Sequence, residues 1–563
     1  MKQPTNLAVG TKHLKGFAMI RWDFWSLVTG GALVALAIFL LYPFSSLIWR
    51  SFITESGQFT LRNYGDFFRL PYYYRTLTNS MSVCVTTTLL ATAIGLPLAY
   101  ITTRYNIWGK KLLNLMIIMS LLSPPFIGAY SWILLLGRSG FLTKLFQSVG
   151  ITMPPIYGWF GIILVFTLKF FPFVYLYVSG ALGSIDRSLE EAAENLGVHG
   201  WKRLLSITFP LILPTILSGA LMVFMSSLAD FGTPMLIGEG FKVLPVLVYE
   251  EYMSEIGGNA SVASTLSVLI ILCATAVLLF QKWIITRKNY TMSALRPPAI
   301  KALNPGMRVL LTAVCYAIAL VAVLPQAVVV ITSFLKTNGP IFVAGFSLES
   351  YATIMYKLSH NITNTFLYAT IAIVIMVLSG LVLSYVIVRR RSKRTALLDV
   401  LIMFPYVVPG AVLGITLLVA FNQRPLLLSG TWFILVLAYI IRKLPYTIRS
   451  STAILYQIDP SIEEASINLG VAPMKTFFKT TAVLMMPGVF SGAILSWITT
   501  INELSSSVML YTGKTATISV AIYTEVVRAS FGTAAALASI LTVATIISLL
   551  IFYKISGGKE VSM

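Results

Sequence analysis

The sequence predicts an all-α polytopic membrane protein with about twelve transmembrane helices in two parallel six-helix repeats. Three observations carry this prediction: an apolar composition, a succession of long hydrophobic segments, and an internal duplication. Of the 563 residues, 57% are hydrophobic and 11% are charged, and the mean hydropathy is +0.83. Soluble domains carry about 25% charged residues, so this chain could not cover a water-facing surface of its size. A soluble enzyme is therefore excluded.

Hydrophobic segments of membrane-spanning length recur along the whole chain. About 20 apolar residues in a helix cross a hydrocarbon core about 30 Å thick. We expect spans at residues 25–49, 80–103, 112–136, 157–182, 209–229, 262–284, 308–333, 363–388, 397–420, 431–455, 482–503 and 532–553. The first is too long for the apolar region of a signal peptide and lacks a small-residue cleavage site, so we expect it to be retained.

The net charge of +21, from 41 Lys and Arg against 20 Asp and Glu, fits either a nucleic-acid partner or basic cytoplasmic loops. Basic residues gather between spans, above all at residues 104–111, 282–308 and 389–394. We therefore expect membrane lipid and no nucleic acid as a partner, these loops in the cytoplasm, and both termini on the same side. The loop between the first and second spans argues against this orientation, because it would be external and yet contains Arg50, Arg62, Arg69 and Arg75.

Cysteine and histidine offer neither a disulfide framework nor a metal site. Cys84, Cys273 and Cys315 each lie in an apolar segment without a second cysteine nearby, and we expect them to be small core residues. The histidines are scattered over different loops, at His13, His199 and His360. No metal-ligating residue is therefore predicted.

The second half of the chain repeats the first. Residues 186–198 align without gaps on residues 459–471 and match at nine of thirteen positions, at an offset of 273. Further upstream the offset is 285, so the second half lacks about a dozen residues in between. Each half holds six spans, and an even number orients both copies alike. We predict a first repeat at 1–290, a cytoplasmic linker at 291–307 and a second repeat at 308–563.

Other matched pairs support the alignment. At an offset of 273, the same or a similar residue recurs at Lys169 and Arg442, Pro172 and Pro445, Pro214 and Pro487, Gly219 and Gly492, and Asp230 and Glu503. At an offset of 285, the matched residues are Asn79 and Asn364, Gly95 and Gly380, Tyr100 and Tyr385, and Arg104 and Arg389.

The best-matched segment is a loop on the cytoplasmic side, at about 186–209 and again at about 459–482. Residues 188–191 and 461–464 fit the S-x-x-E capping box that begins a helix. Gly197 and Gly470 fit the left-handed position that ends one. Each copy therefore predicts a helix of about two turns. A single copy is read most simply as a solvated amphipathic helix, but two copies at equivalent places indicate a docking element that is used twice.

Glu190-Glu191-Ala192 with Gly197, and Glu463-Glu464-Ala465 with Gly470, resemble the "EAA…G" loop of the permease subunits of bacterial type I ABC importers. The resemblance covers nearly the whole chain as two fused six-span units. It implies that each loop is a coupling helix seated in one of two ATP-binding cassette subunits, which would bind ATP and Mg²⁺. The chain itself would hold no cofactor. It also implies a multi-pass protein of the bacterial inner membrane and a substrate-binding protein at the external face.

The cargo is suggested by the fusion and by residues 228–234, Leu-Ala-Asp-Phe-Gly-Thr-Pro, which resemble the iron(III) permeases. Polyamine, thiamine, sulfate and phosphonate permeases share the architecture and remain alternatives. The predicted external loop from Asp230 to Ala260 has a net charge of −4, which favours a cation. The second half reads Asn502-Glu503-Leu504-Ser505 where the first reads Ala229-Asp230-Phe231-Gly232, so the halves differ here.

Four ionisable residues are candidates for the pathway or gate, because charges at membrane depth are costly and often functional. Lys169 and Arg442 are matched cations within the fourth and tenth spans. The alternative is that each snorkels or pairs inside the bundle. Asp230 and Glu503 end the fifth and eleventh spans, and we expect them near the external face. There they either cap and pair, or form an acidic mouth that suits a cation.

No catalytic residue is predicted. Gly513-Lys514-Thr515 resembles the end of a phosphate-binding loop, but Val508 stands where that loop needs glycine. ATP hydrolysis is therefore expected on separate subunits. A six-plus-six secondary transporter remains a rival, although it would need protonatable groups near the midplane. A membrane-embedded enzyme would need converging His, Asp or Ser groups, and the sequence offers none.

Overall fold

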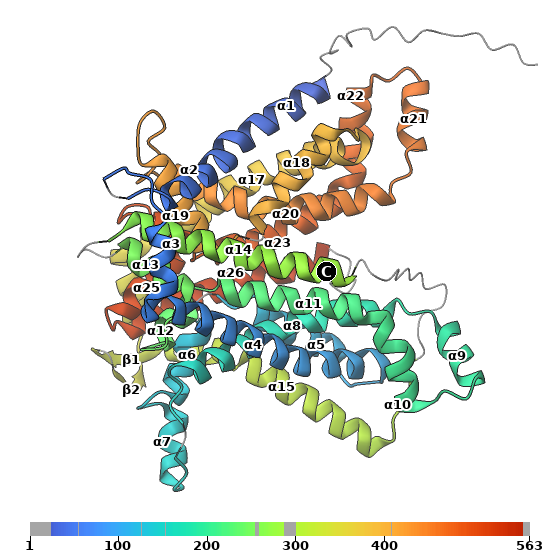
Figure 1. Ribbon diagram of the computed structural model, residues 1–563. Helices are drawn as coiled ribbons and strands as arrows, with labels where there is room; N and C mark the ends of the chain where they lie inside the picture. The colour runs from blue at the N-terminus through green and yellow to red at the C-terminus, as the bar shows by residue number, and fades with distance from the viewer. Residues whose placement is uncertain are drawn as a thin grey trace, which may run out of the picture.

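Long apolar segments become long helices, because a helix satisfies every backbone polar group within its own segment. The computed structural model describes residues 24–54, 56–124, 127–152, 154–253, 258–285, 300–339, 341–406 and 408–555. These parts are helical except for one antiparallel pair of strands and the connecting loops. In Figure 1 the long helices run between two ends of the molecule.

The described helices of the first half are α1 (Phe24–Leu36), α2 (Tyr42–Ser51), α3 (Arg62–Arg69), α4 (Pro71–Arg104), α5 (Lys110–Leu121), α6 (Ile127–Leu136), α7 (Phe141–Ser148), α8 (Trp159–Gly183), α9 (Arg187–Asn195), α10 (Gly200–Arg203), α11 (Phe209–Ala229), α12 (Gly232–Ile237), α13 (Leu244–Met253) and α14 (Ala260–Ile285). Two π-helical turns lie between helices, at Ala37–Leu41 and Leu204–Thr208.

The second half contains α15 (Pro305–Thr332), β1 (Leu335–Asn338), β2 (Ile341–Phe346), α16 (Glu349–Thr353), α17 (Ser359–Arg389), α18 (Lys393–Met403), α19 (Gly410–Phe421), α20 (Trp432–Gln457), α21 (Ser461–Asn468), α22 (Pro473–Thr476), α23 (Ala482–Ile501), α24 (Ser507–Leu510), α25 (Ile518–Val527) and α26 (Phe531–Ile555). Further π-helical turns occur at Ile354–Leu358 and Phe477–Thr481, and a 3₁₀ turn occurs at Phe404–Tyr406.

Nine continuous helical runs in the described residues are long and apolar enough to cross a membrane. They correspond to nine of the twelve expected spans. The expected third span is divided into α5 and α6. The ninth is divided into α18 and α19, and the chain bends by 111° between them. Pro124 lies at the first break and Pro409 at the second, and proline cannot donate the backbone hydrogen bond of a continuing helix.

The expected tenth span is the helix α20, but its composition is more polar than that of the other spans. It carries Arg442, Lys443 and Arg449. Long stretches of α20 are nevertheless buried, so this helix lies inside the bundle, where the cations find protein partners.

The repeat is visible in the helix boundaries. α8 and α20 begin at Trp159 and Trp432, and the π-helical turns Leu204–Thr208 and Phe477–Thr481 are also 273 residues apart. The two halves differ in length between α6 and α8, at residues 137–158, and between α19 and α20, at residues 422–431. The first of these connections contains α7, so α7 belongs to the segment of about a dozen residues that the second half lacks.

Matched glycines bring the central helices of each half together. A Cβ atom on Gly219 would lie 3.0 Å from the Cα of Val174, and one on Gly492 would lie 2.9 Å from the Cα of Thr447. Gly95 and Gly380 likewise lie against α8 and α20. Small residues allow such close backbone approach in membrane bundles. α4, α8 and α11 therefore form one tightly packed group, and α17, α20 and α23 form the other.

The first span of each half packs against the opposite half. The Trp25 ring centroid at the start of α1 lies 4.6 Å from that of Tyr385 and 5.0 Å from that of Phe477. On α15, the side-chain amide of Gln326 donates to the carbonyl of Met119, 2.6 Å away, in α5. The two repeats therefore interlock, and a boundary in sequence is not a boundary in space for α1 and α15.

The predicted linker at 291–307 is described only from residue 300 onward, and residues 291–299 lie outside the described part. The amide of Lys301 donates to the carbonyl of Arg104, at 2.8 Å. The described end of the linker is therefore attached to the end of α4. The division into repeats at 1–290 and 308–563 stays a prediction.

Candidate coupling helices and central cavity

The repeated loops form four short helices at one end of the molecule. Figure 1 places α9 and α10 there with α21 and α22, while α3, α13 and the β1–β2 pair lie at the opposite end. α10 and α22 continue through the π-helical turns into α11 and α23. Each surface helix is therefore connected to a membrane helix by a short continuous segment.

The predicted capping boxes are wrong. In the first copy the Asp186 carboxylate accepts from the backbone N–H of Ser188, at 2.8 Å, and in the second Asp459 accepts from the N–H of Ser461, at 2.9 Å. α9 begins at Arg187, with Asp186 as its N-cap, and α21 begins at Ser461, after Pro460. Neither serine is therefore the N-cap, and an aspartate, which is a favoured residue at helix starts, accepts the serine's amide instead. The hydrogen bond from the Ser461 amide lowers the pKa of Asp459 below its ordinary value.

The predicted left-handed glycines are confirmed. Gly197 has a φ of +75° and Gly470 a φ of +85°. In each copy the next residue donates backward over the turn: the Val198 amide to the Ala193 carbonyl at 2.9 Å, and the Val471 amide to Ser466 at 3.2 Å. This is the Schellman motif that ends a helix.

The two short helices present apolar side chains that the chain does not cover. Leu196 is 82% exposed and Leu469 is 85% exposed. Ala192 and Ala465 are also exposed. The same apolar face therefore recurs on both copies. Glu191 is half exposed and pairs with Arg187 at 2.7 Å on its own helix. Glu464 is exposed.

Glu463 faces inward. Its carboxylate accepts from the Arg389 Nε atom at 3.0 Å and from the Tyr385 hydroxyl at 3.0 Å, and its side chain is 12% exposed. Arg389 also donates to the carbonyl of Ile458, at 2.7 Å. These contacts hold α21 to the end of α17. In the first half, the counterparts of Tyr385, Arg389 and Glu463 are Tyr100, Arg104 and Glu190. The Glu190 side chain lies outside the described residues.

The first copy has a contact of its own: Arg203 of α10 forms an ion pair with Glu194 of α9. The residues at these positions in the second half are Thr476 and Ile467, which cannot pair in this way. The two copies therefore have the same arrangement of short helices but are stabilised by different side-chain contacts.

A cavity of about 260 Å³ lies between the halves. All four predicted pathway residues line it: Lys169 on α8, Asp230 after α11, Arg442 on α20, and Glu503 after α23. Lys443 of α20 lines it too. The structure therefore brings the matched cations and acids of both repeats to one place.

The first half contributes one ion pair. The Lys169 Nζ atom lies 2.9 Å from Asp230 Oδ2. The other carboxylate oxygen, Oδ1, accepts from the backbone N–H of Thr233 at 2.9 Å. Asp230 therefore pairs with a cation and also caps α12, which are the two ordinary roles that the sequence left open.

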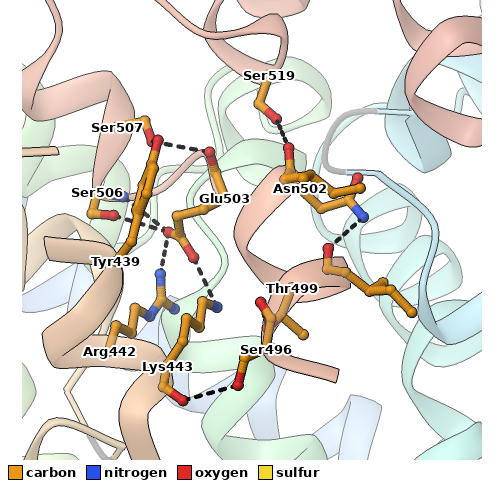
Figure 2. Close-up of polar contacts among 12 residues, drawn as sticks. Tyr439, Arg442, Lys443, Ser496, Thr499, Asn502, Glu503, Ser506, Ser507 and Ser519 are labelled. Carbon is orange, nitrogen blue, oxygen red and sulfur yellow. Dashed lines mark hydrogen bonds and ion pairs between the residues drawn. The ribbon is translucent and has the colours of Figure 1, made fainter. Parts of the chain in front are cut away.

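The second half contributes a three-membered cluster, shown in Figure 2. Glu503 pairs with Arg442 and, through Oε2, with the Nζ atom of Lys443 at 2.9 Å. Its Oε1 also accepts from the amide and the hydroxyl of Ser506, at 3.2 and 3.1 Å. The Glu503 side chain is 4% exposed. Lys443 was not among the predicted site residues; the signal that could have found it is a second cation beside Arg442 in an apolar segment.

Of the two roles considered for Asp230 and Glu503, the structure shows pairing and not an open acidic mouth. Glu503 is buried and the Asp230 side chain is 12% exposed, and each is paired because α11 and α23 end beside residues in the interior of α8 and α20. The acidic segment that follows Asp230 is also largely neutralised: Glu239 pairs with Arg138 at 2.9 Å, and Glu250 with Lys242 at 2.6 Å. Glu251 accepts from the Tyr73 hydroxyl at 3.3 Å, and Glu255 lies outside the described residues.

The described residues hold no group of three or more His, Cys, Asp or Glu side chains that could bind a metal ion. Val508 lies in α24, and residues 512–515 form a turn closed by the Thr515 amide and the Thr512 carbonyl at 3.0 Å. The segment Gly513–Thr515 is therefore part of a turn that follows a helix and not a strand.

The sequence profile of one family, described as the binding-protein-dependent transport system inner membrane component, matches residues 91–290 and 380–558. The ferric transport system permease protein FbpB of Actinobacillus pleuropneumoniae is 28% identical over 553 residues, 94% of this chain and 79% of that protein. A putative ferric transport system permease of Haemophilus influenzae is 29% identical over 85% of this chain and 76% of its own length. The molybdenum transport system permease ModB of Escherichia coli K12 is 29% identical over 36% of this chain and 90% of its own length.

Proposed function

Because the chain belongs to the family of binding-protein-dependent transport system inner membrane components, we propose that it is the fused permease of an ATP-driven importer and that its cargo is iron(III). The observation that carries the cargo assignment is the extent of the similarity. The two ferric permeases match 94% and 85% of this chain, whereas the molybdenum permease matches 36% of it. Polyamine, thiamine, sulfate and phosphonate remain alternative cargoes of the same architecture.

Two ATP-binding cassette subunits bind at the end where α9 and α21 lie, one on each helix, and they hold ATP and Mg²⁺. The exposed Leu196 and Leu469 support this, since each would be covered in such a complex. The chain itself is not an enzyme in this proposal.

The second half offers a physical route from the ATPase to the cavity. α21 is held to α17 through Glu463 and Arg389, and it continues through α22 and a π-helical turn into α23. α23 ends next to Glu503, which lines the cavity. A displacement of α21 therefore moves the cavity wall. Nucleotide shifts the balance between two states of the permease only to the extent that it binds one of them better.

A substrate-binding protein docks at the opposite, external end, and the protein lies in the bacterial inner membrane. The α1 helix begins beside Phe477, close to the coupling segment. The first described residue and the coupling helices therefore share the cytoplasmic side in this proposal, in line with the expected location of both termini.

A six-plus-six secondary transporter is the second candidate, and it needs carboxylates that change protonation. The two carboxylates in the cavity are instead held by cations, Asp230 at 2.9 Å from Lys169 and Glu503 at 2.9 Å from Lys443. Each carboxylate is already engaged by a cation of the protein, and this supports the ATP-driven importer.

The test is uptake of ⁵⁵Fe(III) into proteoliposomes that contain the chain, its ATPase subunits and a loaded binding protein. We expect uptake that needs ATP and both partners, and no ATP hydrolysis by the purified chain alone. ATP turnover by the chain alone, or uptake driven by a proton gradient without partners, would overturn the proposal.

A further inference from the structure

The charged lining of the central cavity has more positive than negative groups. Three cations, Lys169, Arg442 and Lys443, face two carboxylates, Asp230 and Glu503. The excess arises because the second half has Lys443 where the first half has Phe170. A wall of this kind attracts anions and repels a bare metal cation.

The two carboxylates are already occupied. Each of the four carboxylate oxygens accepts from a protein donor, and a cation lies within hydrogen-bond distance of each group. A trivalent ion that approached Glu503 would also approach Arg442 and Lys443. Within the described residues there is no His, Cys, Asp or Glu cluster that could take the ion instead.

The cations retain donors for a ligand. An ammonium group has three N–H donors and a guanidinium has five. Lys169 donates to Asp230, and Lys443 lies at ion-pair distance from Glu503, each through one Nζ contact of 2.9 Å. Lys169 and Arg442 both have side chains that are 19% exposed. Charged donors of this kind form short, strong hydrogen bonds with carboxylate and phosphate oxygens.

We propose that this cavity is an oxyanion-binding site, and that iron(III) crosses it as a complex with a phosphate or carboxylate ligand whose oxygens contact Lys169, Arg442 and Lys443. The inference rests on the proposed iron(III) function and specifies the chemical form of the cargo. The protein then recognises the oxygens of the ligand and supplies no metal ligands of its own.

Co-transport tests the chemical form directly. Proteoliposomes with the chain, its ATPase and its binding protein receive ⁵⁵Fe(III) in carbonate-free buffer, with [³³P]phosphate in one arm and [¹⁴C]citrate in the other. We expect ATP-dependent entry of ⁵⁵Fe together with labelled anion, at about one anion per iron, in at least one arm. The two arms distinguish phosphate from carboxylate. Entry of ⁵⁵Fe with neither label would overturn the inference.

The same experiment separates this inference from the proposed function. Absence of ⁵⁵Fe uptake in both arms would contradict the iron(III) cargo itself. Uptake of the labelled anion without ⁵⁵Fe would also contradict that cargo, while it would support an oxyanion site. ⁵⁵Fe uptake without anion leaves the importer function intact and removes only the oxyanion complex.

Charge variants give a second readout whose sign differs between the two forms of cargo. For an oxyanion complex, Lys443→Met lowers ⁵⁵Fe uptake at least fivefold and Lys443→Arg restores it. For a bare cation, Lys443→Met leaves uptake unchanged or raises it. Arg449→Gln is the matched control, since Arg449 lies on the same helix outside the cavity and pairs with Asp399 at 3.5 Å. Lower uptake in Lys443→Met without rescue by arginine would contradict the charge argument.

Discussion

The Nζ atom of Lys443 lies 2.9 Å from the Oε2 atom of Glu503, at a position where the first repeat has Phe170. Glu503 is therefore paired with two cations, whereas Asp230, its counterpart, is paired with one cation of the described residues, Lys169. Each half contains one matched acid–cation pair, and Lys443 gives the second half one additional positive charge.

Glu503→Gln leaves Arg442 and Lys443 side by side in a buried place without a neutralising charge. Removing one partner of a buried ion pair costs about 3 kcal/mol or more. We expect a large fall in the thermal unfolding temperature of the detergent-purified chain. Asp66→Asn is the control, because Asp66 pairs with an exposed Arg62 at 3.3 Å and exposed pairs contribute about 0–1 kcal/mol. Equal destabilisation by both changes would contradict the role of Glu503.

Gly470→Val places a branched side chain at a φ of +85°, a conformation that costs a non-glycine residue about 1–2 kcal/mol. The end of α21 should be distorted, so ATP hydrolysis by the partner subunits should no longer drive transport. The protein should remain in the membrane, and the measurement is the ratio of ATP hydrolysed to ⁵⁵Fe imported. Gly183→Ala is the control, since its Cβ would meet nothing within 4 Å. An unchanged ratio in Gly470→Val and in the matching Gly197→Val would count against coupling through these helices.

Glu463→Gln removes the charge that holds α21 to Arg389, at 3.0 Å, on α17. The α21 helix should then open more often, because its remaining residues are not buried. We expect faster backbone hydrogen exchange over residues 461–468 in the purified permease. Glu464→Gln provides the comparison, since Glu464 is the exposed neighbour on the same helix. Equal exchange in the two variants would show that the carboxylate of Glu463 does not anchor the helix.

Gly492→Ala tests the close contact between α23 and α20. The added Cβ atom would lie 2.9 Å from the Cα of Thr447 and 2.8 Å from the Cβ of Ser450, so backbone must move. Overpacking of this kind costs about 1–3 kcal/mol. The thermal unfolding temperature should fall, whereas Gly31→Ala, where a Cβ would meet nothing within 4 Å, should leave it nearly unchanged. A stable Gly492→Ala variant would mean that the two helices can separate without loss.

Most of the fold could be predicted from local patterns. Nine expected spans, and α20 as a tenth, are continuous helical segments, and the offset of 273 recurs in the boundaries of α8 and α20. The divided spans could not be placed by hydropathy, which counts apolar residues and is insensitive to where Pro124 and Pro409 end a helix. The capping boxes failed for a related reason: Asp186 and Asp459 compete with the serines for the same helix start, and the sequence alone does not rank them.

The candidate site was predicted only as a set of residues. Lys169, Asp230, Arg442 and Glu503 were recognised because charges stand out in apolar segments, and the repeat matched them in pairs. Their partners and depth were not predicted. Lys443 was missed because its importance depends on Glu503, which lies 60 residues further along the chain and reaches it only when α20 and α23 pack together.

What the sequence determined by itself was the membrane class, the duplication, and the glycines that end α9 and α21, since each of these depends on composition or on neighbouring residues. The tertiary structure alone decided that α1 and α15 pack against the opposite halves, that Glu463 turns inward to Arg389, and that the two acid–cation groups share one cavity. The physical reason is that ion pairs act over a few ångströms between helices that lie far apart along the chain. The net charge of the cavity lining is therefore set by the packing of the helices, which decides which charged groups face the cavity.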